Sequence, residues 1–269
     1  MHGDIDLSGR TAVVTGAGRG FGRAIATALA AAGAAVAVTA RTRAQIEETA
    51  AQIQASGGHA LAVAADVTRR GDVDNLMAAV EKELGSPDIL VNNAGITGPF
   101  GPLWAVDPDQ WWAAQEVHVR GAQLTMHGVL PGMRRHGRGC IINVSARAGQ
   151  VVAPNLSAYA VAKAAQIRLT EHVARECRED GIAVFAIEPG TVITALAEST
   201  LASDDARRWL PGMVQRLGEL REKQDTADGL AHCANLCLAL ASGRFDDLSG
   251  RYLDVADDLE ALLRQAPAR

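Results

Sequence analysis

The chain has 269 residues, of which 48% are hydrophobic and 21% charged, and its formal net charge is -5 at pH 7. This length favours one domain with a sizeable core and is too short for two large domains. Because the charges form no long run of one sign, the sequence provides no electrostatic footprint for nucleic acid or for an anionic membrane. A small-molecule partner is therefore expected.

Targeting, membrane and metal signals are weak throughout the chain. No apolar stretch reaches the roughly 18 residues needed to cross a bilayer, and the first 15 residues lack a secretory pattern. The four cysteines show no CxxC spacing, which favours buried free thiols over a metal site. We expect a cytoplasmic protein without a metal ion.

Short apolar runs rich in Val, Ile and Ala alternate with Ala-rich stretches of helical periodicity. This alternation is typical of βαβ units in a parallel sheet that is covered on both faces. The pattern predicts a doubly wound α/β fold in a single domain, 1–269. The expected strands are 11–15, 35–40, 60–65, 88–92, 139–144, 182–187 and 251–255, and the expected helices are 22–32, 43–55, 72–84, 108–135, 158–179 and 227–241.

Segment 191–226 interrupts this rhythm, since it is longer than a plain crossover and mixes charged with apolar residues. Long insertions in compact domains are often functional. Two interpretations stay open: a lid over a substrate site, or an ordinary pair of surface helices.

A glycine-rich turn follows the first expected strand and opens the first expected helix. The unpaired amides and the positive end of the helix dipole favour a pyrophosphate at such a position. The spacing departs from GxGxxG, because Phe21 stands where that fingerprint has glycine, so the turn alone is weak evidence. The turn comprises Gly16, Ala17, Gly18, Arg19, Gly20, Phe21 and Gly22.

Three further motifs lie at or just beyond expected strand ends: Asn92-Asn93-Ala94-Gly95, Tyr159-x3-Lys163 and Pro189-Gly190. In order and interval, TGAGRGFG, NNAG, YAVAK and PGTVIT resemble the short-chain dehydrogenase/reductase family over nearly the whole chain. The resemblance implies a Rossmann-type fold with a seven-stranded parallel sheet. It also implies an oxidoreductase that moves a hydride between a nicotinamide cofactor and a small carbonyl or alcohol.

The end of the second expected strand indicates which dinucleotide is bound. A carboxylate there would bond the ribose 2′-hydroxyl of NAD, but this chain has Ala40, followed by Arg41. A guanidinium matches a phosphate in a bidentate way, so Arg41 with Arg19 predicts a clamp for the 2′-phosphate of NADP(H). The alternative is that these arginines form a solvated helix start.

Other cofactor contacts follow only from the resemblance. Asp66 and Val67 correspond to the pair that brackets the adenine, and Asn93, with Ala94 and Gly95 after it, to the residues beside the adenosine ribose. Asp66 is equally explained as a helix N-terminal cap. The residues that correspond to the nicotinamide end are Pro189, Gly190, Val192 and Thr194.

Tyr159 and Lys163 are four residues apart on an expected helix, so their side chains share one face. A tyrosine is a poor base at its ordinary pKa near 10. A neighbouring ammonium and the positive nicotinamide ring would stabilise the phenolate and lower that pKa, so that the phenol can exchange the substrate's proton. The resemblance gives Lys163 a second role, bonding the nicotinamide ribose.

Two positions depart from the family pattern. The family's serine that holds the substrate oxygen falls on Ala146, while Ser145 lies one place earlier and faces the other way on an extended strand end. A small loop adjustment would bring Ser145 into the site. The family's asparagine on the long helix is His118, which either takes part in a proton relay or acts as an acid, or simply bonds in a helix contact.

These departures leave three hypotheses. The first is an NADP(H)-dependent oxidoreductase with Tyr159 as acid/base. The second is a redox-neutral enzyme of the same fold, such as an isomerase, dehydratase or cyclase, and the third is a non-catalytic dinucleotide-binding protein.

The walls of the substrate pocket are expected from 96–106, 146–156 and 191–220, and Trp104 and Trp209 indicate a largely apolar pocket. The long helices 108–135 and 158–179 resemble those that pair family members into a homodimer or homotetramer.

Overall fold

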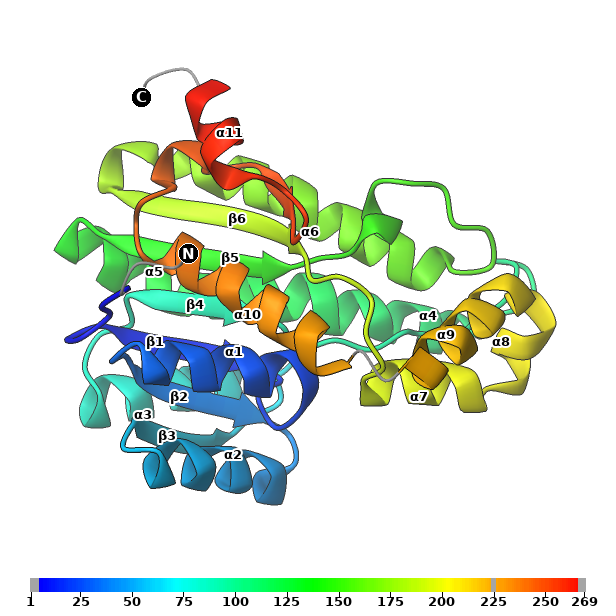
Figure 1. Cartoon of the computed structure of the whole chain (residues 1–269), viewed down its shortest axis with the longest axis horizontal. Helices are drawn as coiled ribbons and strands as arrows, with labels where there is room; N and C mark the ends of the chain where they lie inside the picture. Colours follow the sequence, from blue (N-terminus) through cyan, green and yellow to red (C-terminus); the bar gives the residue numbers. More distant parts are fainter. Residues whose placement is uncertain (1–4, 224–225, 266–269) are drawn as a thin grey trace.

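The computed structural model describes residues 5–223 and 226–265, and their strands form one sheet with helices on both faces (Figure 1). All neighbouring strands are parallel, and their order is β3-β2-β1-β4-β5-β6-β7. The predicted doubly wound, seven-stranded sheet in one domain is confirmed. The strands are β1 (Thr11–Thr15), β2 (Ala35–Ala40), β3 (His59–Ala64), β4 (Ile89–Asn92), β5 (Gly139–Val144), β6 (Ile182–Glu188) and β7 (Tyr252–Asp254).

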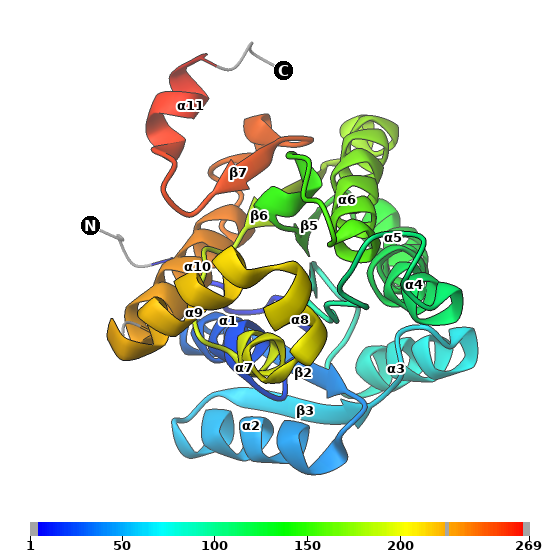
Figure 2. The ribbon, with the colours of Figure 1, turned by 90° about the vertical axis from the view of Figure 1, so that its right-hand side faces the viewer.

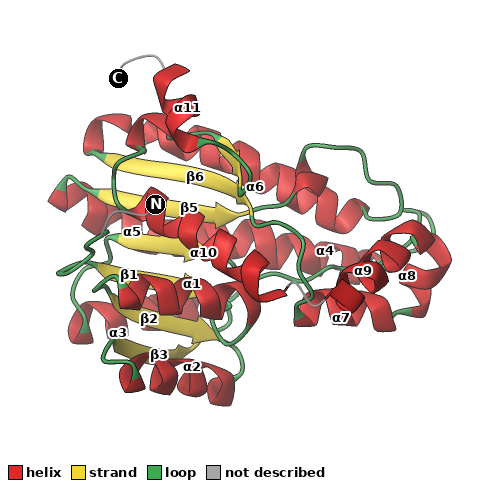
Figure 3. Ribbon diagram, in the orientation of Figure 1, coloured by secondary structure: helices red, strands yellow, loops and turns green. Residues whose placement is uncertain are grey.

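The helices cover the sheet in two layers, as Figure 3 shows. α1, α2 and α10 pack on one face, and α3, α5 and α6 on the other. The α-helices are α1 (Gly20–Ala31), α2 (Arg43–Ala55), α3 (Arg70–Glu83), α4 (Pro108–Gln115), α5 (Gly121–His136), α6 (Ser157–Glu176), α7 (Ala195–Ala202), α8 (Asp204–Trp209), α9 (Pro211–Lys223), α10 (Thr226–Ala241) and α11 (Leu259–Gln265). The short helices are η1 (Glu116–Arg120), η2 (Arg147–Gly149), η3 (Arg178–Asp180) and η4 (Asp246–Leu248).

The central strands are buried along their whole length, which explains why they are continuous apolar runs without alternation. Successive side chains of each strand point to opposite faces of the sheet. Ile142 and Phe185 therefore join the core beneath α1 and α10, whereas Ile141 and Val184 join the core beneath α3, α5 and α6. The two apolar cores hold the sheet rigid, so the polar residues at its carboxyl edge are held in fixed positions.

The expected helix 108–135 is present, but it is not a regular α-helix along its whole length. It begins as α4, where Asp107 caps the first turn by accepting a hydrogen bond from the amide of Gln110. It then passes through the π-helical turn η1 before α5 continues to His136. A π turn accommodates an extra residue without breaking the apolar stripe, so periodicity alone could not reveal it. His118 lies in this turn and is buried.

The expected insertion 191–226 contains α7, α8 and α9, which lie beyond the carboxyl ends of the strands (Figure 2). Positions 224 and 225 of the insertion fall outside the described residues. The sequence did not predict α11, a short helix that follows β7. Within 5–223 and 226–265, no helix combines the length and apolar character that a bilayer crossing needs.

A buried network of polar side chains joins β4, β5, α5 and α6 below the carboxyl edge. The Asn92 amide donates to the side-chain oxygen of Asn143 at 2.9 Å, and Thr125 donates to the side-chain oxygen of Asn92 at 2.6 Å. Asn143 in turn donates to the hydroxyl of Thr170 at 2.9 Å. All four residues are buried, so the loss of Asn143 would leave the Asn92 amide without a hydrogen-bond acceptor.

We predict that Asn143→Leu lowers the free energy of unfolding by about 2 to 3 kcal/mol, because it leaves the Asn92 amide buried without an acceptor. Urea unfolding followed by circular dichroism measures the change. Asn75→Leu on the exposed face of α3 is the matched control and should change stability by less than about 0.5 kcal/mol. Equal stability of Asn143→Leu and the wild type would contradict the proposed role of the network.

Candidate active site

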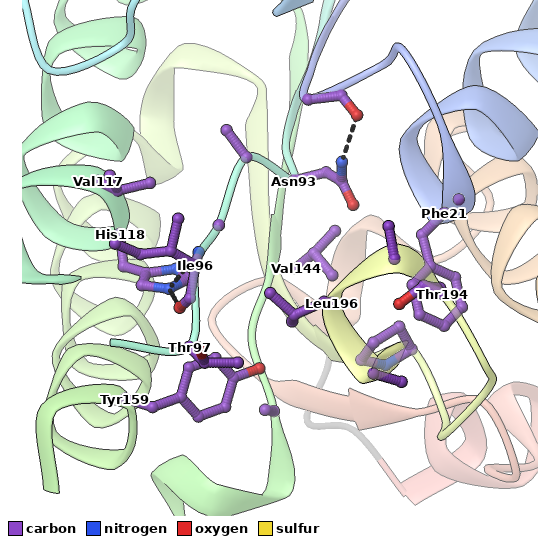
Figure 4. Close-up of a pocket in the computed structure, with 18 of the residues that line it drawn as sticks. Phe21, Asn93, Ile96, Thr97, Val117, His118, Val144, Tyr159, Thr194 and Leu196 are labelled. Carbon is purple, nitrogen blue, oxygen red and sulfur yellow. Dashed lines mark hydrogen bonds between the residues drawn. The ribbon is translucent and has the colours of Figure 1, made fainter. Parts of the chain in front are cut away.

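A cavity of about 460 Å³ lies at the carboxyl ends of the central strands. It is lined by almost every residue that the sequence singled out, and Figure 4 shows several of them around it. Gly22, Trp104 and Trp209 are exceptions. The expected residues on the wall are Gly16, Gly18, Arg19, Gly20, Phe21, Arg41, Asp66, Val67, Asn93, Ala94, Gly95, His118, Ser145, Tyr159, Lys163, Pro189, Gly190, Val192 and Thr194.

The glycine turn requires glycine for reasons of space as well as backbone angle. Gly16 has a φ of +64°, and a Cβ there would lie 2.9 Å from the Cα of Ala94. A Cβ on Gly22 would lie 2.4 Å from the carbonyl oxygen of Gly16, so this glycine packs the helix against the turn instead of lining the cavity. Arg19, the N-cap residue of α1, forms no side-chain cap hydrogen bond, so the first amides of the helix are available to an anionic ligand.

Asn93 holds the glycine turn against the end of β4. Its side-chain amide donates to the carbonyl oxygens of Thr15 at 2.8 Å and Gly16 at 3.2 Å. The hydroxyl of Thr15 accepts hydrogen bonds from the backbone amides of Asn93 and Ala94, each at 3.0 Å. The sequence placed Asn93 beside a ribose, and the structure gives its amide the additional task of fixing the turn.

Arg23, which the sequence did not single out, fixes the outer side of the turn. Its guanidinium donates to the carbonyl oxygen of Gly18 at 2.6 Å and to the Glu48 carboxylate at 3.0 Å. The sequence could have indicated this role through the position of Arg23, one residue after the last glycine of the turn.

Asp66 also has a local role, since its carboxylate accepts hydrogen bonds from the amide and the hydroxyl of Thr68. These bonds close a turn before α3, whose own N-cap is Arg69.

The far end of the cavity, beside β2, is positively charged. Arg19 and Arg41 are exposed and line this end together with Ala40 and Gln45. Among the residues that the structure describes, neither arginine forms an ion pair within 4.0 Å. Arg41 interacts electrostatically with Asp66 but forms no close ion pair, so both guanidinium groups can bond a phosphate bound between them.

Lys163 and Tyr159 lie together on the inner face of α6. The ammonium of Lys163 donates to the carbonyl oxygen of Val144 at 2.7 Å and to the side chain of Gln166 at 3.0 Å. It lies 5.5 Å from the centroid of the Tyr159 ring. Burial lowers the pKa of Lys163 to about 7, although the charge of Glu188 acts in the opposite direction. The third ammonium hydrogen remains for the phenol or for a ligand.

The phenol of Tyr159 points from α6 into the pocket (Figure 4). Burial raises its pKa above the ordinary value, and the negative charge of Glu188 adds to this effect. The expected lowering of the pKa is therefore absent in the protein by itself. Desolvation of the phenolate outweighs the nearby lysine, so Tyr159 holds its proton.

Ser145 is buried, and its hydroxyl donates to the carbonyl oxygen of Lys163 at 3.0 Å. This bond ties the end of β5 to α6 and engages the hydroxyl that a catalytic role would need. The next residue, Ala146, lines the cavity and has an extended backbone. Ala146, which the resemblance aligns with the family's serine, brings only a methyl group to the cavity, and the expectation that a loop shift brings Ser145 into that role gains no support.

His118 makes a structural contact. Its Nε2 lies 2.7 Å from the carbonyl oxygen of Ile96, close enough to donate an N–H (Figure 4), and its ring stands edge-on to Tyr159 with centroids 5.5 Å apart. Burial lowers its pKa to about 3, and the positive charge of Lys163 contributes. A histidine that stays neutral at physiological pH is not an acid, so the alternative of a bonded packing residue is the one that the geometry favours.

Glu188, at the end of β6, is a cavity residue that the sequence analysis missed. Its Oε2 accepts a hydrogen bond from the Tyr252 hydroxyl at 2.9 Å and another from the backbone amide of Arg147. The signal was a carboxylate at the end of an otherwise apolar strand, directly before Pro189-Gly190. A charged side chain is rarely placed there without a partner.

The fold and the site define a doubly wound α/β protein whose glycine turn and Tyr-Lys pair face one cavity. The model of the short chain dehydrogenase family matches residues 10–205. The chain belongs to the short-chain dehydrogenase/reductase family, and members of this class use nicotinamide cofactors to act as oxidoreductases.

Relatives over nearly the whole chain are named dehydrogenases. A short chain dehydrogenase of Pseudocercospora fijiensis is 37% identical over 265 residues, which cover 97% of this chain and 84% of the relative. The 2-(R)-hydroxypropyl-CoM dehydrogenase of Xanthobacter autotrophicus is 39% identical over 246 residues, covering 90% and 98%. A gluconate 5-dehydrogenase from Burkholderia cenocepacia, solved with NADP and tartrate, superposes with a TM-score of 0.80 at 29% identity and covers 96% and 98% of the two chains.

The buried neutral state of His118 predicts a pH-dependent loss of stability. The unfolded chain binds a proton at His118 below about pH 6.5, whereas the folded chain does so only near pH 3. Stability that is present above the unfolded pKa is therefore lost as the pH falls toward the folded pKa. Between pH 7.5 and pH 5, this residue should account for a loss of about 2 kcal/mol.

Urea unfolding at both pH values measures this loss in the wild type and in His118→Asn, and the loss should be about 2 kcal/mol smaller in the variant. His136→Asn, at an exposed histidine, is the matched control and should keep the wild-type difference. An identical pH dependence in His118→Asn and the wild type would show that His118 is not buried neutral.

Proposed function

We propose that this chain is an NADP(H)-dependent oxidoreductase that transfers a hydride between the nicotinamide and a small carbonyl or alcohol substrate. The observation that carries the proposal is the placement of Tyr159 and Lys163, with the ammonium 5.5 Å from the phenol ring, on the wall of the cavity that the glycine turn opens. This arrangement brings a proton donor to the same space as an anion-binding helix start.

The residues fit a dinucleotide. The tight turn at Gly16 and the uncapped start of α1 leave backbone amides for the pyrophosphate. Arg19 and Arg41, at the β2 end of the cavity, suit a 2′-phosphate. When bound, the cofactor supplies or accepts the hydride at its nicotinamide ring. NADP over NAD is supported by Ala40 in place of a carboxylate, by Arg41, which forms no ion pair within 4.0 Å in the described part of the chain, and by the NADP that the gluconate 5-dehydrogenase contains.

Proton handling then falls to Tyr159. In the direction of reduction, the phenol donates its proton to the substrate oxygen as negative charge develops there, and its raised pKa keeps that proton available. In the direction of oxidation, the phenol must lose its proton, and the Lys163 ammonium stabilises the phenolate that results. The bonds to Val144 and Gln166 hold the ammonium in position.

The methyl group of Ala146 removes one hydrogen-bond donor from the substrate oxygen. Loss of one such donor typically slows the chemical step by about a hundredfold or more. We propose that a polar group elsewhere in the pocket orients the substrate, so that Tyr159 remains the donor to its oxygen.

We propose that α7 to α9 act as the substrate lid. Leu196, Met213 and Leu217 from this segment line the cavity together with Ile96 and Phe100, and their apolar side chains can exclude water from the reacting groups. The expectation for the two tryptophans is wrong. Trp104 is 89% exposed, and Trp209 packs near Gly101; neither lines the cavity.

The cytoplasmic location and the homodimer or homotetramer remain predictions. The exposed Trp112 and Val161, on α4 and α6, support pairing through these helices.

We predict that Tyr159→Phe lowers kcat for the oxidation of NADPH by a ketone by about 10² to 10⁴-fold, because the substrate oxygen loses its proton donor. The Kd for NADPH should stay within about twofold of the wild type, since the ring remains in place. Steady-state absorbance assays with a ketone panel measure kcat, and fluorescence titration measures the Kd. Unchanged turnover in Tyr159→Phe would disprove the proposed role of the phenol.

We predict that Arg41→Ala raises the Kd for NADPH about tenfold or more, because a charge-assisted bond to the 2′-phosphate is lost. The Kd for NADH should change little. Arg43→Ala is the matched control, since Arg43 lies at the same helix start but pairs with Glu47 and does not line the cavity. Equal effects of Arg41→Ala on both dinucleotides would overturn the assignment of NADP(H).

A further inference from the structure

We propose that Glu188 is a specificity-determining residue whose free carboxylate oxygen accepts a hydrogen bond from a hydroxyl on the carbon next to the reacting one. The substrate class is then a 2-hydroxy ketone and the vicinal diol that corresponds to it. This inference rests on the proposed function and names the substrate class of the same site.

The end of β6 places Glu188 beside the gap that Ala146 leaves. β5 and β6 run side by side with Val144 opposite Ile187, and the amide of Ser145 continues the ladder by donating to the carbonyl oxygen of Ile187 at 2.8 Å. The backbone amide of Arg147, directly after Ala146, donates to the Glu188 carboxylate. The carboxylate thus lies against the loop where the family carries its substrate-binding serine, and it lines the same cavity.

One carboxylate oxygen is engaged and the other is open. Both anchoring donors, the Arg147 amide and the Tyr252 hydroxyl, converge on Oε2. Within the described part of the chain, Oε1 takes part in no hydrogen bond and Glu188 in no ion pair. The anchors fix the orientation of the carboxylate, so Oε1 is a preorganised acceptor.

The charge of Glu188 reaches the reacting pair. Burial has the larger effect on both groups, raising the pKa of Tyr159 and lowering that of Lys163. The negative charge of Glu188 raises the pKa of both. The carboxylate therefore acts on the space that a substrate held by Tyr159 would fill.

The chemistry of a carboxylate decides what it can bind there. An ionised carboxylate only accepts hydrogen bonds, so it cannot replace the missing serine as a donor to the substrate oxygen. The substrate oxygen accepts its hydrogen bond from the phenol of Tyr159. The carboxylate therefore requires a hydrogen-bond donor on a neighbouring carbon of the substrate. A hydroxyl supplies one, whereas a methyl group of similar size leaves the carboxylate desolvated without a partner.

The test compares two ketones of similar shape, 2-hydroxycyclohexanone and 2-methylcyclohexanone, with NADPH. The measured quantity is the ratio of the two kcat/KM values, which does not depend on the active fraction of a preparation. The wild type should favour the hydroxy ketone. In Glu188→Gln the two anchoring donors hold the amide oxygen and turn the NH₂ toward the cavity, so the ratio should fall about fivefold, and in Glu188→Ala about tenfold or more.

Asp254→Asn is the matched control, because it removes a carboxylate from the neighbouring strand β7 that does not line the cavity. Its ratio should equal that of the wild type. If Glu188→Gln slows both ketones by the same factor, Glu188 only supports the fold of the site and the inference is overturned.

A binding experiment separates this inference from the proposed function. Isothermal titration of the NADP⁺-loaded protein with cis-1,2-cyclohexanediol should give a Kd about fivefold lower for the wild type than for Glu188→Gln. If the protein reduces neither ketone, the proposed function fails while this difference still supports a hydroxyl site at Glu188. Equal diol affinities in the two proteins overturn the inference whether or not the ketones react.

Discussion

The junction between the glycine turn and the end of β4 is the interaction on which the rest of the site depends. Asn93 donates to the carbonyl oxygens of Thr15 and Gly16, and the Thr15 hydroxyl accepts from the two backbone amides that follow β4. These bonds occupy the carbonyl groups that the turn would otherwise leave unpaired. The amides at the start of α1 then remain for a ligand, and Gly16 and Gly22 are required because the two backbones approach too closely for a Cβ.

A second set of hydrogen bonds fixes Tyr159 and Lys163 beside the glycine turn. Lys163 donates to the last carbonyl of β5, while Ser145 donates back to the carbonyl of Lys163. The two bonds fasten α6 to the sheet edge, so the phenol of Tyr159 stands at a fixed place in the cavity. Because both ends of the link are buried, the ammonium and the phenol are desolvated, and their pKa values move toward the neutral forms.

The two residues that depart from the family pattern, His118 and Ala146, line the same cavity as Glu188. His118 bonds the loop after β4, Ala146 presents a methyl group, and Glu188 adds a carboxylate beside it. A neutral histidine and an alanine give the substrate oxygen no donor beyond the phenol. In the proposed site, the substrate oxygen accepts a hydrogen bond from the phenol, and the carboxylate requires in addition a hydrogen-bond donor on the neighbouring carbon.

By itself, the sequence determined the fold class, the approximate positions of the seven strands and most of the cavity wall, because buried parallel strands and the glycine turn leave local patterns in the chain. It also located Ala146, since a fixed interval from Tyr159 survives in the sequence. Only the tertiary structure decided the hydrogen-bond partner of Ser145, the neutral state of His118 and the place of Glu188 in the cavity wall. Each depends on which distant backbone group lies within hydrogen-bond distance and how much water burial removes, and neither quantity is carried by residue spacing. The π-helical turn at 116–120 belongs with them, because one extra residue in a turn leaves the apolar stripe on both sides intact.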